Sequence, residues 1–491
     1  MKNFKNFSYI ILGGLMFGSL FSCQKEELDI DISDPILHRQ NYSKASNSSE
    51  MTKLGEKLKN PYSVENMKKA WESLKEKTKV SQNIEIKTTH YYVKFTPKNE
   101  EELSLLKSDK SLILFDRPLD YEIKQQGNYY HDPEIPTEQP TYQYASIPVG
   151  NKLPEKIHFE ILEKLFIPDE DSETNPLKSD GTIEQLVDES LKLTGNLDEN
   201  APMETWFSKW KPAGKIQVWD NALNRHIPLH GIQVYAVRWF TAYTGKTDAN
   251  GNFSCNGNFR HRANYFFRWE TNDFRIGSEI VKFKESFFYR KSNFPKGGFR
   301  LNGPNKKGDW NLNIQNGKDR IHGTIYRALY HYHYGNIKNL RRPIYGSNTI
   351  GIIEISDYNT VPNNTSELYA ETINSIVRIV HADMNPNIYN NISAKMSLSW
   401  AKGVEWELTR MVYPNYQATY NNDNITGIVQ DMIDPIQQPY DKVAGYTIRQ
   451  LEDAINGQTT WRGWRDAIIN SYNNPYELNL HNYQFTVWKF K

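Results

Sequence analysis

One short apolar segment sets the strongest limit on what this chain can become. Tyr9–Leu20 follows a positively charged start, and its length of about a dozen residues is typical of a signal peptide rather than of a helix that spans a bilayer. The segment leads into Leu20-Phe21-Ser22-Cys23, which matches a lipobox with an apolar residue three positions and a small residue one position before the cysteine. We therefore predict that residues 1–22 are removed as a signal peptide and that Cys23 is lipidated. The alternative is an ordinary signal peptide followed by a chance cysteine.

The residues after the cysteine indicate where such a lipoprotein is delivered. Gln24, Lys25, Glu26 and Glu27 resemble the export signal of surface-exposed lipoproteins in Bacteroidota, a lysine and two acidic residues beside the lipidated cysteine. The resemblance implies an outer-membrane protein that faces the cell exterior, and the alternative is the periplasmic face of the same membrane. Because several acyl chains anchor far more firmly than one, the membrane is an expected partner through the lipid at Cys23.

The remaining composition restricts the partners and the cofactors. Loss of residues 1–22 reduces the 59 basic side chains to 57, against 58 acidic ones, and a chain without a basic surplus is not suited to non-specific nucleic-acid binding. With Cys23 lipidated, Cys255 stands alone, which excludes an intrachain disulfide and a multi-cysteine metal site. The aromatic share of 13% leaves two interpretations open, stacking platforms for a glycan partner or the packing of irregular β-structure.

Changes of pattern along the chain predict a multidomain α+β protein. We expect a lipidated tether with a short helix at 23–85, a small α/β N-terminal unit with its linker at 86–205, a β-sandwich at 206–300 and a mainly α-helical domain at 301–491. Hydrophobic periodicity and turn residues predict the N-terminal elements. The expected helices are Val64–Lys79 (capped by Ser63), Glu100–Leu106, Pro154–Leu165 and Thr182–Leu193, and the expected strands are His90–Phe95 and Leu112–Phe115.

A turn in the β-region links it to a known fold. The strand-like segments around the turn are Ile216–Trp219, Ile232–Val237 and Tyr265–Trp269. Thr247–Phe253 resembles the T-D-x-x-G-x-F turn of carboxypeptidase-regulatory-like domains, in which Gly251 supplies a positive φ and Phe253 points back into the core. Upstream, Gly214–Val218 and Pro228–Val234 fit the G-x-I/V and P-L-x-G-V segments of the same domain. The resemblance implies a transthyretin-like β-sandwich that supports or binds and carries no catalytic residues.

The C-terminal region changes to a helical pattern. The expected helices are Arg320–Tyr334, Ser366–Asp383, Ser397–Tyr413, Thr447–Asn456 and Trp461–Asn470. Their order, His381 and the segment Ser399–Trp406 resemble the catalytic part of zincin metallopeptidases, in a form found among Bacteroidota lipoproteins. An active zincin carries H-E-x-x-H on one helix, with two zinc ligands one turn apart and a glutamate as general base.

The resemblance also implies that the zinc site and the peptidase activity of a zincin are lost in this chain. Aligning His381 with the second histidine of the motif places Val377 at the first ligand and Arg378 at the general base, while Leu398 stands where the ligand carboxylate falls. Valine and leucine have no lone pair for a metal, and a protonated arginine repels a dication. We therefore expect a zincin-like pseudopeptidase with no catalytic residue, no metal and no cofactor. The alternative is that His381 belongs to an unrelated helical domain.

Two further groups of polar residues have alternative interpretations. An alternative zinc site would use His322, His331, His333 and His381. His331 and His333 are two positions apart in a helical pattern, so they do not share a helix face. Glu405 and Glu407 are expected on a helix surface rather than as an acid/base pair.

Three functional hypotheses are therefore consistent with the sequence. The leading hypothesis is a non-catalytic binding or scaffolding lipoprotein at the outer membrane, in a complex with another outer-membrane protein. The alternatives are a zinc metallopeptidase with relocated ligands and a glycan-capture lipoprotein. A closed, apolar former active site would favour the first hypothesis, and an exposed row of aromatic side chains would favour the glycan hypothesis.

Overall fold

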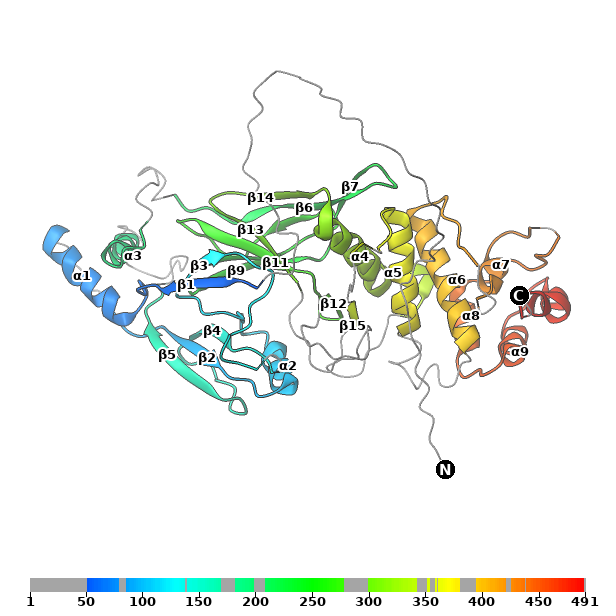
Figure 1. The fold of residues 1–491 in the computed structure, drawn as a ribbon, viewed down its shortest axis with the longest axis horizontal. Helices are drawn as coiled ribbons and strands as arrows, with labels where there is room; N and C mark the ends of the chain where they lie inside the picture. The colour runs from blue at the N-terminus through cyan, green and yellow to red at the C-terminus, as the bar shows by residue number, and fades with distance from the viewer. Residues whose placement is uncertain are drawn as a thin grey trace, which may run out of the picture.

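The protein is a mixed α and β structure in which small, mostly antiparallel sheets are followed by a succession of helices (Figure 1). The computed structural model describes residues 51–78, 85–136, 139–168, 182–197, 208–277, 299–341, 351–353, 358–359, 361–379, 394–420, 425–437 and 439–489. The predicted lipidation site and export signal at 23–27 lie outside the described residues, and so does His381.

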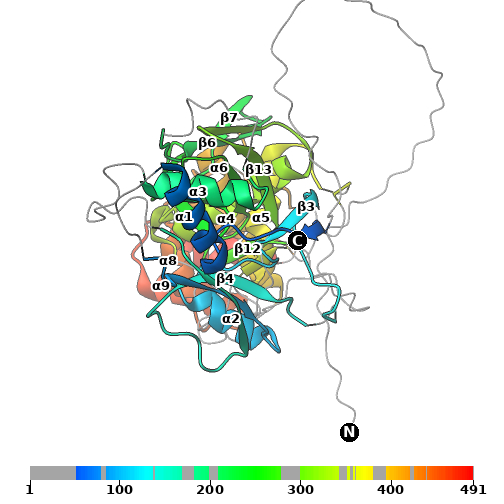
Figure 2. The same cartoon turned by 90° about the vertical axis from the view of Figure 1, so that its left-hand side faces the viewer.

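The N-terminal part contains two small antiparallel sheets and three helices. Its elements are β1 (Lys53–Lys57), α1 (Val64–Thr78), β2 (His90–Phe95), α2 (Glu100–Ser108), β3 (Tyr121–Gln125), β4 (Gln143–Pro148), β5 (Phe159–Leu165) and α3 (Thr182–Leu193). One sheet has the strand order β4-β2-β5, and the other pairs β1 with β3. Helix α1 packs against α3, as the view of this end of the molecule shows (Figure 2). The Ser63 hydroxyl accepts the N–H of Asn66 at 3.1 Å, so the predicted cap of α1 is confirmed.

Three expectations for this part are corrected. The predicted tether is shorter than residues 23–85, because β1 pairs with β3 and the apolar face of α1, with Met67 and Trp71, is buried. Pro154–Leu165 is not a helix, since its second half is β5, which pairs with β2. Leu112–Phe115 is not a strand, and within it Phe115 forms an isolated bridge with Tyr144. Pairing between distant segments overrides local propensity in each of these segments.

The central part has two sheets packed on each other. Its strands are β6 (Ala213–Asp220), β7 (Arg225–Pro228), β8 (Gln233–Arg238), β9 (Thr241–Lys246), β10 (Asn252–Ser254), β11 (Ala263–Arg268), β13 (Arg300–Lys306) and β14 (Trp310–Ile314). One sheet has the order β10-β6-β14 with β7 added beside β6, and the other has the order β13-β11-β8-β9. The rings of Tyr265 and Trp310, one from each sheet, lie 5.4 Å apart. Because β14 pairs with β6 in parallel, the sheets extend past residue 300, where the sandwich was predicted to end.

The turn predicted at the centre of this part is confirmed in its local geometry. The Asp248 carboxylate accepts the backbone N–H groups of Asn250 and Asn252 at 2.8 and 2.9 Å. Gly251 has a φ of 78°, and Phe253 is buried beside Tyr265. The turn therefore closes in the left-handed conformation that glycine adopts most easily.

The C-terminal part is mainly helical. Its larger helices are α4 (Gly317–Tyr334), α5 (Thr365–Ile379), α6 (Ala394–Val412), α7 (Ile428–Ile433), α8 (Ile448–Ile455) and α9 (Trp461–Ser471), followed by α10 (Glu477–Asn479), η5 (Leu480–Gln484) and α11 (Phe485–Lys489). Helices α4 to α7 pack one against the next along the body, and α8 packs against α9. The five predicted helices are confirmed over the residues that the structure describes. No helix within the described ranges is both long and apolar enough to cross a bilayer.

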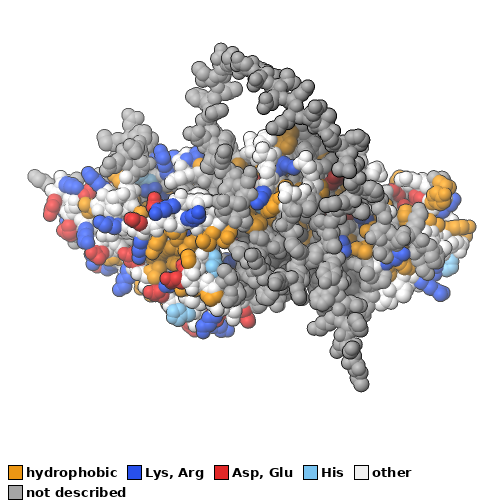
Figure 3. All heavy atoms as spheres, viewed as in Figure 1, with side chains coloured by type: hydrophobic (Ala, Val, Ile, Leu, Met, Phe, Trp, Pro, Cys, Tyr) orange, Lys and Arg blue, Asp and Glu red, His pale blue; other side chains and the backbone are white. Residues whose placement is uncertain are grey.

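One apolar core joins the central sheets to the helices. It runs from Trp269 beside the sheets, through Tyr326 of α4 and Trp400 of α6, to Trp464 of α9. A second core lies between the N-terminal part and the other face of the sheet β13-β11-β8-β9, and the rings of Tyr92 and Phe240 lie 4.8 Å apart in it. Positive and negative side chains intermingle over the N-terminal part (Figure 3), as their near-equal numbers predict.

Candidate functional site

The described positions of the predicted lost zinc site lie on two helices that pack together, Val377 and Arg378 on α5 and Leu398 on α6. Val377 of α5 has an exposed fraction of 0% and belongs to the core that joins the sheets and the helices. The next residue, Arg378, is partly buried, and burial lowers the pKa of its guanidinium. Leu398 of α6 is also partly buried. Val377 is therefore closed off from solvent, while His381 lies outside the described residues.

The other predicted histidines are held separately along α4. The His322 ring is buried, and its Nε2 lies 2.7 Å from the Tyr358 hydroxyl. His331 Nδ1 lies 2.5 Å from the Tyr369 hydroxyl, and His333 Nδ1 lies 2.7 Å from the carbonyl oxygen of Leu329. Among the described residues these histidines do not form a group whose ligand atoms converge.

Glu405 and Glu407 were expected on a helix surface, but both are buried in the structure. Their exposed fractions are 1% and 0%, because α6 is covered on one side by α5 and on another by α7. Lys402 Nζ lies 2.6 Å from the Glu405 carboxylate, and Arg410 Nη2 lies 2.5 Å from that of Glu407. Each carboxylate therefore has a cationic partner on its own helix, an arrangement typical of a structural ion pair.

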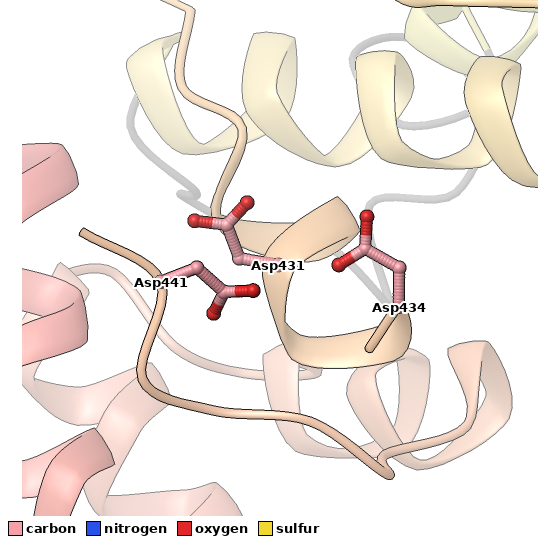
Figure 4. Close-up of side chains that lie close together, drawn as sticks. All are labelled: Asp431, Asp434 and Asp441. Carbon is pink, nitrogen blue, oxygen red and sulfur yellow. The ribbon is translucent and has the colours of Figure 1, made fainter. Parts of the chain in front are cut away.

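A different group of acidic residues converges near the C-terminal end of the protein. Asp431 lies in the last turn of α7, Asp434 caps the helix, and Asp441 lies in the loop that follows (Figure 4). Each offers one carboxylate oxygen, and these oxygens all lie within 4.8 Å of one another. Within the described residues this is the group of three or more histidine, cysteine, aspartate or glutamate side chains whose ligand atoms lie this close together.

Local structure explains how the three carboxylates are brought together. Ile428, Val429 and Met432 bury the apolar face of α7, which places Asp431 and Asp434 beside the following loop. The Asp441 carboxylate accepts the backbone N–H of Gln437 at 2.9 Å and of Val443 at 3.1 Å. The loop is therefore folded around the Asp441 side chain.

Neutral groups surround the three carboxylates. Asp431 accepts hydrogen bonds from the Gln484 amide at 2.6 Å and from the Trp488 indole N–H. Asp434 accepts longer bonds from the amides of Gln430 and Gln437, at 3.2 and 3.3 Å. The charge of Arg410 partly offsets the rise in the pKa of Asp434. The local negative charge is therefore solvated mainly by amide and indole N–H groups.

The electrostatics follow from this arrangement. Burial, together with repulsion from the neighbouring carboxylates, raises the pKa of Asp431 to about 7 and that of Asp434 to about 6. Burial also raises the pKa of Asp441. Three such oxygens form a donor set for a hard cation such as Ca²⁺ or Mg²⁺, whereas zinc sites mostly use nitrogen and sulfur ligands.

The sequence pattern did not predict this group of aspartates. The available signal was the spacing of Asp431 and Asp434, three positions apart and therefore on adjacent turns of one helix. The third ligand position, Asp441, depends on the path of the loop, which the spacing does not predict. No family model, no curated protein and no solved structure matches the chain.

Proposed function

We propose that this protein is a lipid-anchored component of the outer-membrane surface that binds or scaffolds a partner and has no peptidase activity. The observation that carries the proposal is the burial of Val377 in the apolar core, at the position where the zincin alignment requires a zinc ligand. A closed apolar position cannot coordinate a metal ion or admit a substrate. This is the geometry expected of a zincin-like domain whose former active site has been filled.

The central sheets support a binding or supporting role in the same proposal. The turn at Thr247–Phe253 has the left-handed glycine and the buried phenylalanine expected of a transthyretin-like sandwich. The sheet β13-β11-β8-β9 also contacts the cores on both of its sides, since Phe267 of β11 belongs to the core shared with the helices and Phe266 to the core of the N-terminal part. A sandwich in this position holds the parts of a scaffold in a fixed arrangement, and the expected partner is another outer-membrane protein.

The aromatic side chains favour packing over glycan capture. Every tryptophan in the described ranges is buried or partly buried. Among the tyrosines of those ranges, Tyr440 and Tyr483 are the exposed ones. The high aromatic share therefore contributes mainly to the cores, as aromatic side chains commonly do in irregular β-structure.

The anchor is tested by lipid labelling in cells. The wild-type chain, Cys23→Ala and the control Cys255→Ala are expressed with a clickable fatty-acid analogue, and the labelled membrane fraction is measured. We expect label on the wild type and on Cys255→Ala but none on Cys23→Ala. Equal labelling of Cys23→Ala would refute lipidation at this residue.

Surface exposure and the absence of catalysis need separate measurements. Protease treatment of intact cells should digest the wild type and spare a Lys25→Ala/Glu26→Ala/Glu27→Ala variant that is still lipidated. Zinc analysis of the purified mature protein should find far less than one ion per chain. Near-stoichiometric zinc that falls in His381→Ala would reject the pseudopeptidase and favour a zinc peptidase with relocated ligands.

A further inference from the structure

The aspartates beside α7 form an unusual concentration of buried negative charge. Asp434 and Asp441 are buried, Asp431 is partly buried, and their oxygens lie within 4.8 Å of one another. Carboxylates that share a site repel each other, and burial strengthens the repulsion because the local dielectric is low. Such a group is stable when protons or a cation compensate its charge.

A second observation concerns Asp434 alone. Its exposed fraction is 7%, yet its Oδ1 atom is fully enclosed and accepts no hydrogen bond from another described residue. Its other oxygen has the two long contacts with Gln430 and Gln437. A buried acceptor without a partner costs free energy, and a cation bound at this position would satisfy it.

We propose that Asp431, Asp434 and Asp441 bind one Ca²⁺ ion, which holds α7, the chain around Asp441 and the C-terminal segment together. The proposal does not depend on the scaffolding function or on the zincin alignment. It rests on the convergence of three carboxylates and on the unpartnered Asp434 oxygen.

The number of carboxylates favours Ca²⁺ over the smaller Mg²⁺. Ca²⁺ takes several carboxylate oxygens at about 2.4 Å in a flexible geometry, whereas Mg²⁺ is usually held by one or two carboxylates. Mg²⁺ demands a tighter octahedron at about 2.1 Å and gives up its waters reluctantly. Waters would complete the Ca²⁺ shell, which accepts six to eight oxygens.

The ion would act on segments that are far apart in sequence. Asp431 already contacts Gln484 and Trp488 near the C-terminal end, and the backbone N–H of Lys442 donates to Gln484 Oε1 at 3.1 Å. A ligand set that includes Asp441 links this loop to α7 as well. Removal of Ca²⁺ should therefore loosen the C-terminal end before the cores that lie further along the body.

Terbium luminescence provides a direct test, because Tb³⁺ replaces Ca²⁺ at oxygen sites and the Trp488 indole donates a hydrogen bond to Asp431, one of the proposed ligands. Tb³⁺ is titrated into the chelator-treated mature protein with excitation of tryptophan, and Ca²⁺ or Mg²⁺ is then added as competitor. We expect sensitised emission that Ca²⁺ abolishes at a concentration about tenfold or more below that of Mg²⁺. In Asp434→Asn and Asp441→Asn the apparent Ca²⁺ affinity should fall about tenfold or more, since loss of even an outer-shell partner costs that much.

Thermal unfolding distinguishes the site from a purely hydrogen-bonded cluster. With Ca²⁺ the melting temperature should rise for the wild type and for the control Glu477→Gln, whose carboxylate is exposed on α10. The folded variants Asp434→Asn and Asp441→Asn should show no rise. If Ca²⁺ changes neither emission nor melting temperature of the wild type, or if the aspartate variants respond as the wild type does, the proposal is wrong. Competition by Zn²⁺ but not by Ca²⁺ would also reject it.

Discussion

Replacement of Gly403 by alanine tests the packing of α6 against α7, the helix that carries two of the aspartates. Gly403 lies inside α6, and a Cβ atom built there would stand 2.2 Å from Cγ1 and 2.3 Å from Cβ of Val429. Val429 is fully buried and β-branched, so its side chain cannot rotate away easily. The backbone of α7 would have to shift.

Two opposing effects decide the outcome of Gly403→Ala. Alanine favours a helix interior over glycine by about 1 kcal/mol, whereas overpacking of a well-packed core costs about 1–3 kcal/mol. Because the clash involves two atoms of a fully buried side chain, we place the overpacking cost in the upper part of that range. We expect a net loss of about 1–2 kcal/mol in the free energy of unfolding, seen as a melting temperature lower by a few degrees.

A matched control separates packing from helix propensity. Gly463 lies in α9, where an added Cβ would approach the amide oxygen of Gln458 at 2.6 Å and the Thr460 hydroxyl at 3.2 Å. The nearer atom ends a flexible side chain that can move, so Gly463→Ala should be neutral or stabilising by up to about 1 kcal/mol. Calorimetry of both variants in the same buffer gives the comparison.

A second variant tests the named contact directly. Val429→Ala removes Cγ1, the atom nearest to the added methyl group, while Cβ of residue 429 remains. The double variant Gly403→Ala/Val429→Ala should therefore be destabilised by less than the sum of the two single variants. If Gly403→Ala raises the melting temperature as Gly463→Ala does, Val429 does not pack against Gly403 and α7 does not lie against this part of α6.

Three further perturbations test other parts of the fold. Burial lowers the pKa of His322 to about 3 from an ordinary 6.5, so below pH 6.5 the unfolded chain binds a proton that the folded chain does not. The free energy of unfolding should therefore fall by about 2 kcal/mol between pH 7 and pH 5. Urea unfolding of His322→Gln should show a smaller fall over the same pH range. Asp220→Asn should lower the free energy of unfolding in urea by about 3 kcal/mol. The buried Asp220 carboxylate accepts a hydrogen bond from Arg327 at 2.8 Å, and its loss leaves a buried cation without its counter-charge. A cost below about 1 kcal/mol would contradict this reasoning. Thr447→Ala should cost about 1 kcal/mol of stability because it removes the capping box with Gln450, whereas Thr447→Ser should retain most of the stability. Equal melting temperatures of the wild type and Thr447→Ala would show that the cap is unimportant.

The sequence by itself determined the features that depend on neighbouring residues. The 3.6-residue periodicity predicts α4, α5, α6, α8 and α9 within a few residues, because one apolar stripe per helix must face a core. The turn at Thr247–Phe253 is predicted for a similar reason, since a positive φ at Gly251 and a buried Phe253 follow from the local pattern. Ser63 was likewise identifiable as a helix cap from the residues around it.

Only the tertiary structure decided features that depend on distant segments. Residues 159–165 form a strand because β2 offers backbone partners, although the local sequence suits a helix. Glu405 and Glu407 are buried because α5 and α7 cover α6, which no local pattern reveals. The convergence of Asp441 with the two aspartates of α7 depends on the path of a loop. Burial and proximity are properties of the packed chain, so they emerge only when segments separated in sequence exclude water together.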